Sequence, residues 1–156
     1  MNRTLYDQLI GKETALPFSL PAWIALAPFE EYLDMRIDEA AEGSATLSMP
    51  FRAVHCQGAG LMHGGAVISL ADTALVIAIK TLLPEGTHFA TIDMSLQFHA
   101  PVLWGRVRAI ASVTERSEKD IRGEVTIVTE DGIKAATFKA VFRIKKERKE
   151  TGTPVG

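Results

Sequence analysis

The sequence has little cysteine, little excess charge and no uninterrupted apolar run, and each shortage excludes a class of protein. Cys56 is the only cysteine in 156 residues, which excludes an intrachain disulfide and a cysteine-rich zinc site and fits a reducing compartment. Seventeen Lys and Arg against 19 Asp and Glu leave a net charge of −2, so the basic excess that non-specific nucleic-acid binding requires is missing. The longest apolar stretch, residues 66–83, contains Asp72 and Lys80, so we expect no membrane span.

Targeting signals are also missing from the sequence. Residues 1–20 mix charged and apolar side chains, so they lack the apolar core of a signal peptide. We therefore expect a cytoplasmic protein with no nucleic-acid or membrane partner, no metal and no cofactor. The length predicts one domain, and a chain of this size buries enough surface to fold without a disulfide or a metal.

The order of predicted elements divides the chain into three parts. Residues 1–30 are predicted to form a short helix and a segment that Pro17, Pro21 and Pro28 punctuate. Residues 31–145 are predicted to form the main domain, and residues 146–156 a flexible tail rich in charge, Gly and Pro. Apolar periodicity and turn residues, such as Asp131-Gly132, predict one helix over residues 66–83 and six strands. The strands are expected at residues 32–37, 43–49, 91–98, 106–114, 122–129 and 134–144.

The predicted helix is apolar almost all round, which is typical of a buried helix. One helix covers a sheet of this size only if the sheet curls around it. The sequence therefore predicts an α+β fold in which a curled antiparallel β-sheet wraps one long central helix.

Asp72 lies on the one polar stripe of this helix, with Ser69, Thr73 and Lys80. An unpaired buried carboxylate costs free energy, so Asp72 needs a partner, a raised pKa or a cleft. Carboxylates with perturbed pKa values are candidates for functional sites. Two interpretations stay open at this point: a reactive carboxylate in a cleft, or a structural carboxylate that pairs within the fold or across an oligomer interface.

His63-Gly64-Gly65 comes directly before the helix. Glycine at a helix entry lets backbone N–H groups face a ligand, and the helix dipole favours an anion or a developing oxyanion there. The alternative is a tight turn that needs positive φ. Gly64 and Asp72 are eight residues apart, which is ~12 Å along one helix. If both act on one substrate, they must come from two subunits, so this chemistry predicts a dimer with its sites at the interface.

These residues form a recognisable motif. The segment from Gln57 to Ala74, with His63-Gly64-Gly65 and then Leu70-Ala71-Asp72, resembles the signature of hotdog-fold acyl-CoA thioesterases. The nearest groups are the phenylacetate-pathway and 4-hydroxybenzoyl-CoA thioesterases, and the resemblance covers roughly residues 25–145. It implies the hotdog fold, in which a curled sheet wraps one long helix. It also implies hydrolysis of an acyl-CoA, or acyl-carrier, thioester by a dimer that is usually part of a tetramer.

The resemblance also implies roles for individual residues. Asp72 falls where the family has its catalytic acid, acting as nucleophile or general base, and Gly64 falls where a backbone N–H polarises the thioester carbonyl. His63 and Gln57 fall where the family lines the thioester site. The substrate contacts predicted beside them are Gly65 and Thr73.

The chain departs from some relatives at two places. The hydroxyl that some members carry one turn after the acid is replaced by Val76, which leaves Thr73 as the neighbouring hydroxyl. The basic residues that some relatives use for the coenzyme A phosphates are not matched. Residues that could substitute for them are Arg106, Arg108, Arg116, Lys119 and Arg122.

Other interpretations compete with catalysis by Asp72. A non-catalytic hotdog module that binds acyl groups or serves assembly is the main alternative, and a hotdog dehydratase would need a different His motif. A Cys56 nucleophile lacks a positioned base, and the spacing of Cys56 with its neighbouring histidines fits no standard zinc site. The remaining aromatic and Met side chains are expected mainly in the core, with some lining an acyl tunnel: Trp23, Phe29, Tyr32, Met94 and Phe98.

Overall fold

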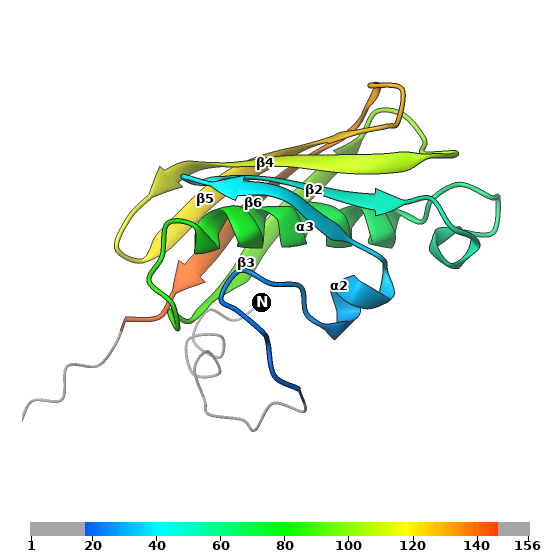
Figure 1. Ribbon diagram of the computed structural model, residues 1–156. Coiled ribbons are helices and arrows are strands. Elements are labelled where there is room, and N and C mark those ends of the chain that lie inside the picture. The colour runs from blue at the N-terminus through cyan, green and yellow to red at the C-terminus, as the bar shows by residue number, and fades with distance from the viewer. Residues whose placement is uncertain (1–17, 147–156) are drawn as a thin grey trace, which may run out of the picture.

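The computed structural model describes residues 18–146, and within them one long helix lies against a curled sheet (Figure 1). The long helix is α3 (Gly64–Lys80), preceded by the short helix α2 (Pro28–Tyr32) and the 3-10 turn η1 (Ala53–His55). The strands are β1 (Arg36–Ala41), β2 (Ser44–Pro50), β3 (Phe89–Phe98), β4 (Arg106–Arg116), β5 (Asp120–Val128) and β6 (Lys134–Ile144).

The six strands form one antiparallel sheet in the order β1-β2-β4-β5-β6-β3. Its central strands alternate buried and exposed residues, and the buried ones form one core cluster with the buried residues of α3. A sheet with one apolar face and one long apolar helix buries both by curling around the helix. The predicted α+β hotdog fold is therefore confirmed.

The long helix begins two residues earlier than the apolar pattern predicts. Gly64 and Gly65 are its first residues, and His63 is the N-cap, with its ring Nδ1 accepting a hydrogen bond from the Gly65 amide at 2.8 Å. Glycine is a poor helix former, so apolar periodicity alone places the start too late. The capping bond stabilises the glycine turn.

The first strand lies at Arg36–Ala41 and not at residues 32–37, where the sequence predicts it. Residues 28–32 form α2 instead, with Pro28 in the first turn and the Glu30 carboxylate accepting a bond from the Ala27 amide at 2.9 Å. Proline is well tolerated in the first turn of a helix, where its missing N–H costs no bond. The helix predicted near the chain start lies outside the described residues, as does the tail apart from Lys146.

Gly123 sets how closely α3 approaches the sheet. A Cβ atom added there would overlap the Leu75 side chain and would lie 2.8 Å from the Ser112 carbonyl oxygen. Leu75 is fully buried on α3. Glycine within a strand often marks such a close approach, because any side chain would separate the two layers.

We expect Gly123→Ala to lower the free energy of unfolding by about 1–3 kcal/mol, the usual cost of overpacking a core. Urea denaturation followed by circular dichroism measures it. Gly58→Ala is the control, because a Cβ at Gly58 meets nothing within 4 Å. Equal midpoints for the two variants would contradict close packing at Gly123.

Candidate active site

The start of α3 is held by the loop that follows β2. The His55 ring donates from Nδ1 to the Pro50 carbonyl at 2.7 Å, and the His55 carbonyl accepts from the His63 amide at 2.7 Å. Cys56 and Met62 form an isolated antiparallel bridge that closes the loop between them. The residue before α3 is therefore tied to the end of β2 through the buried His55.

The amide of Gly64 is the free donor at this helix start. The Gly65 amide is bonded to His63, and the amides of Ala66 and Val67 both donate to the His63 carbonyl. The Gly64 amide has no acceptor among the described residues. Such first-turn amides need an outside acceptor, and the helix dipole favours a negative one.

An apolar pocket of about 310 Å³ opens beside Gly64. Gln57 is the single polar side chain among the described residues that line it, and its Oε1 accepts a bond from the Ala59 amide. The Gln57 amide nitrogen has no hydrogen-bond partner among the described residues, so it is available to a ligand. The lining residues are Gln57, Leu61, Met62, Gly64, Val67, Phe98, Ala100, Pro101, Val102 and Ala135.

Asp72 lies two turns further along α3 and does not line this pocket. Thr91 on β3 donates from its hydroxyl to Asp72 Oδ1 at 3.0 Å. Burial raises the pKa of Asp72 above its ordinary value of 3.8, the Thr91 hydrogen bond works against this, and the nearby Glu30 carboxylate adds to it. One carboxylate oxygen is thus oriented by Thr91, and the group as a whole is more basic than a solvated Asp.

The N-terminal segment packs on the same side of the helix. The Trp23 indole donates to the Lys80 carbonyl at 3.0 Å, and Lys80 Nζ donates to the Trp23 carbonyl at 2.9 Å and lies 4.7 Å from the ring centroid. Burial lowers the pKa of Lys80, while Glu30 opposes this shift. Glu30 therefore influences the ionisation of both polar residues on this side of α3.

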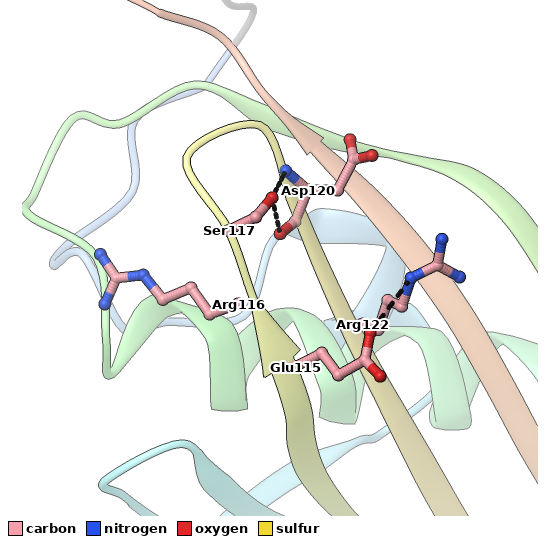
Figure 2. Close-up of a pocket in the computed structure, with 5 residues that line it drawn as sticks. All are labelled: Glu115, Arg116, Ser117, Asp120 and Arg122. Atoms are coloured by element: carbon pink, nitrogen blue, oxygen red, sulfur yellow. Dashed lines mark hydrogen bonds and ion pairs between the residues drawn. The ribbon is translucent and has the colours of Figure 1, made fainter.

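Three of the basic residues considered for phosphate binding, Arg106, Arg116 and Arg122, lie in two separate places. Arg106 donates to Ser48 Oγ at 3.3 Å, near the end of β2. Arg116 and Arg122 lie at the β4–β5 hairpin, beside a polar hollow of about 510 Å³. Figure 2 shows their guanidinium groups extending in different directions: Arg116 donates to the Leu82 carbonyl at 3.2 Å, and Arg122 lies 3.5 Å from Glu115. The full lining of the hollow is Glu115, Arg116, Ser117, Asp120 and Arg122.

The structure brings only some of the predicted site residues together. Gln57 and Gly64 share the pocket, and His63 supports them as the helix cap. The amide of Gly65 is taken by His63, and Thr73 is 9% exposed on the buried side of α3, so neither lines the pocket. Asp72 stands apart from Gln57, His63 and Gly64, as the spacing along the helix predicts.

Sequence reasoning missed Thr91. Thr91 meets Asp72 only because β3 passes beside α3, and no local pattern marks a contact between residues 19 positions apart. Phe98 is 55% exposed and lines the pocket, which is one of the two places expected for this set of aromatic and Met side chains. Exposure of Phe29, Tyr32 and Met94 contradicts the core expectation for them.

Two further observations limit the chemistry of the described residues. Cys56 donates from Sγ to the Arg52 carbonyl at 3.4 Å, an arrangement without a base that would activate the thiol. Within residues 18–146, no three His, Cys, Asp or Glu side chains gather in a way that could hold a metal, and no helix is both long and apolar enough to cross a membrane.

A free amide beside an apolar pocket and a half-buried carboxylate on one helix are the parts of an acyl-transfer site, and comparison with known proteins agrees. Residues 59–136 match the model of the thioesterase superfamily. A protein of Halobacterium salinarum described as a putative esterase is 30% identical over 103 residues, which cover 63% of this chain and 68% of that protein. The chain belongs to the thioesterase superfamily, and it is a hydrolase that acts on thioesters.

Solved structures agree with the fold. A variant of the phenylacetic acid degradation protein PaaI from Thermus thermophilus is 29% identical, with a TM-score of 0.69 over 75% of this chain and 98% of that chain. A conserved protein from Pseudomonas aeruginosa, PA5202, has a TM-score of 0.74 over 78% of this chain and 96% of that chain. At 21% identity, this second similarity concerns the fold alone.

Proposed function

We propose that the protein is an acyl-CoA thioesterase whose site is built by two subunits. The Gly64 amide of one subunit binds the thioester carbonyl oxygen and stabilises the oxyanion that forms as the carbonyl is attacked. Asp72 of the partner subunit attacks the carbonyl or takes a proton from the attacking water. Gln57 lies beside Gly64 and contacts the water or the leaving thiol, and His63 holds the turn in which the Gly64 amide stays free.

The observation that carries this proposal is the free Gly64 amide beside the apolar pocket. A backbone donor at a helix start is fixed before the substrate arrives, so it stabilises the developing charge without reorganising. The raised pKa of Asp72 adds to the case. A base whose pKa lies nearer to neutral accepts a proton more readily than an ordinary carboxylate does.

The position of β3 supports a composite site. It is an edge strand of ten residues, bonded only to β6 among the described strands. Thr91, near its start, contacts Asp72, and Phe98, at its end, lies against Gly64. If two copies pair antiparallel about a point between Met94 and Ser95, residue 91 of one strand lies opposite residue 98 of the other. This pairing brings each Asp72 toward the other subunit's Gly64.

We propose this dimer as the smallest active unit, within a tetramer of the kind that the motif implies. Light scattering on the purified protein measures the mass. A monomer that hydrolyses thioesters at the full rate would contradict the composite site.

Coenzyme A is the thiol we assign to the substrate, and the cytoplasm is the compartment that fits it. The β4–β5 hairpin lies near the C-terminal end of α3, where Arg116 donates to the Leu82 carbonyl. The helix ends at Lys80, which is eight residues or ~12 Å beyond Asp72. Arg116 and Arg122 there are the candidates for phosphate contacts, although Glu115 and Asp120 partly balance their charge. If they hold the nucleotide, Arg116→Ala and Arg122→Ala will raise KM for an acyl-CoA and leave KM for the same acyl group on N-acetylcysteamine unchanged.

Thiol release from a panel of acyl-CoA thioesters tests the activity. Release that disappears in Asp72→Asn supports hydrolysis at this site. Release that persists in a folded Asp72→Asn protein contradicts the role of Asp72. Ligand-dependent stabilisation of the wild-type protein without thiol release would instead favour a non-catalytic acyl-binding module.

The pH dependence of hydrolysis is expected to shift in opposite directions in two variants. Thr91→Val removes the hydrogen bond that stabilises the Asp72 carboxylate, so the pKa of Asp72 rises and the acid limb of kcat moves to higher pH. Glu30→Gln removes a nearby negative charge, so that pKa falls and the acid limb moves to lower pH. Rate profiles between pH 4 and pH 9, at saturating substrate, measure both. An acid limb that moves in neither variant would show that another group is the base.

A further inference from the structure

The pocket beside Gly64 is lined almost entirely by apolar residues, although the proposed substrate is a polar thioester. Its described lining carries no charged side chain and one polar side chain, Gln57. The remaining lining residues are apolar or glycine, and they come from the loop before α3, the first turn of α3, the residues after β3 and the start of β6. Whatever occupies this pocket must therefore have few hydrogen-bonding groups, because buried polar atoms without partners are costly.

Phe98 lines this pocket together with Gly64 and lies against the Gly64 backbone. A Cβ atom built on Gly64 would lie 3.0 Å from Phe98 Cζ, so the tip of the ring rests against the face of Gly64. The side chain is the last of β3 and is 55% exposed in the single subunit, so the core of its own subunit does not fix it on all sides. Its position lets it limit the space beside the Gly64 amide without contributing a polar contact.

We propose that this pocket takes the acyl group of the substrate and that Phe98 sets the size of the acyl group that the enzyme accepts. The inference rests on the proposed function and specifies its substrate class: an uncharged, apolar acyl group. The pantetheine arm fits the pocket poorly, because its two amides would share the single Gln57 side chain. A dicarboxylic acyl group would leave a charge unpaired among apolar walls.

The volume of the pocket gives the expected size. At ~30 Å³ for each water-sized group, the cavity of about 310 Å³ holds roughly ten heavy atoms. The acyl carbonyl lies at the mouth, next to Gly64, and the apolar chain or ring lies inward, with the Phe98 ring packed against it. Longer chains collide with the ring, and removing the ring enlarges the pocket.

The experiment compares kcat/KM for a linear series of acyl-CoA thioesters, from acetyl to hexadecanoyl, together with succinyl-CoA. We expect the wild-type protein to prefer chains of up to about ten heavy atoms and to reject succinyl-CoA by more than about 10-fold, within the range that one mismatched group in a pocket produces. Phe98→Ala is expected to move the preference toward longer chains by about 10-fold, and Phe98→Leu to fall between. Ile110→Ala is the control, because Ile110 is also a half-exposed apolar side chain but lies on the outer face of β4.

Two readouts separate this inference from the proposed function. If the wild type hydrolyses thioesters and Phe98→Ala keeps its chain-length profile, Phe98 does not set the size and the inference is wrong while the function stands. Calorimetric binding of ketone analogues, in which a methylene replaces the thioester sulfur, gives the second readout. Binding with the expected length preference but no hydrolysis of any thioester would support the pocket and contradict the function. Neither binding nor hydrolysis would overturn both.

Discussion

Asp72→Asn is expected to reduce thioester hydrolysis by about 10²–10⁴-fold, the contribution of a positioned general base, or by more if Asp72 is the nucleophile. Asparagine has nearly the same shape and keeps an oxygen that accepts the Thr91 hydrogen bond. It can neither attack the carbonyl nor accept a proton from water. The loss should appear in kcat, measured as thiol release at saturating substrate, with KM little changed.

The same variant is expected to be as stable as the wild type or more stable at neutral pH. Burial raises the pKa of Asp72 above 3.8, so the folded protein favours its protonated form. The stability that this group contributes is present below pH 3.8 and is lost as the pH rises through the folded-state pKa. Above that pH the charged carboxylate costs free energy that asparagine does not. Denaturation midpoints at pH 4 and pH 7 should therefore differ more in the wild type than in Asp72→Asn.

Asp131→Asn is the matched control for this experiment. Asp131 also accepts a hydrogen bond from a threonine hydroxyl, Thr129 Oγ1 at 2.7 Å, but it lies exposed at the β5–β6 hairpin. It should retain wild-type turnover. Equal losses in both variants would mean that a general effect of removing a carboxylate, rather than chemistry at Asp72, lowers the rate.

Gly64→Pro is expected to reduce kcat by about 10²–10³-fold, as removal of one oxyanion donor does in other acyl-transfer enzymes. Gly64 is the first residue of α3, where proline is well tolerated. The preceding residue, His63, has φ −60° and ψ 134°, which is the conformation that a residue before proline prefers. Proline therefore deletes the Gly64 amide hydrogen while the helix start keeps its backbone path.

Gly64→Ala separates the loss of the amide from the added bulk. Both variants place a Cβ atom near Phe98, but alanine keeps the N–H group. Gly64→Ala should retain far more activity than Gly64→Pro. Circular dichroism and the denaturation midpoint show whether each variant folds, and a folded Gly64→Pro protein with wild-type kcat would contradict the oxyanion role.

Mixing the two inactive variants tests the composite site directly. A heterodimer of Asp72→Asn and Gly64→Pro subunits has one site with both defects and one with neither. Random exchange between equal amounts makes half of the dimers mixed, so about a quarter of all sites should be intact. Recovery of about that share of wild-type activity supports two-subunit sites, whereas no recovery after verified exchange contradicts them.

The sequence predicted the parts of the site that lie close together along the chain. The helix, the glycine turn before it and the polar stripe with Asp72 are local features, because a helix repeats every 3.6 residues and its first turn leaves amides unbonded. The separation of Gly64 from Asp72 also follows from helix geometry alone. Strand periodicity and turn residues were enough to predict six strands, and the curled sheet follows from the need to bury them on one helix.

The tertiary structure decided what no local pattern encodes. The contact of Thr91 with Asp72, and of Phe98 with Gly64, arises because β3 returns beside α3 as an edge strand. The first helical turn at Gly64 depends on the His63 cap and on His55, which ties the loop to Pro50. The sequence by itself determined which groups we propose to carry the chemistry, since that proposal depends on residue type, helical spacing and the motif. Packing decided which groups orient and surround them, since that depends on distances between segments far apart along the chain.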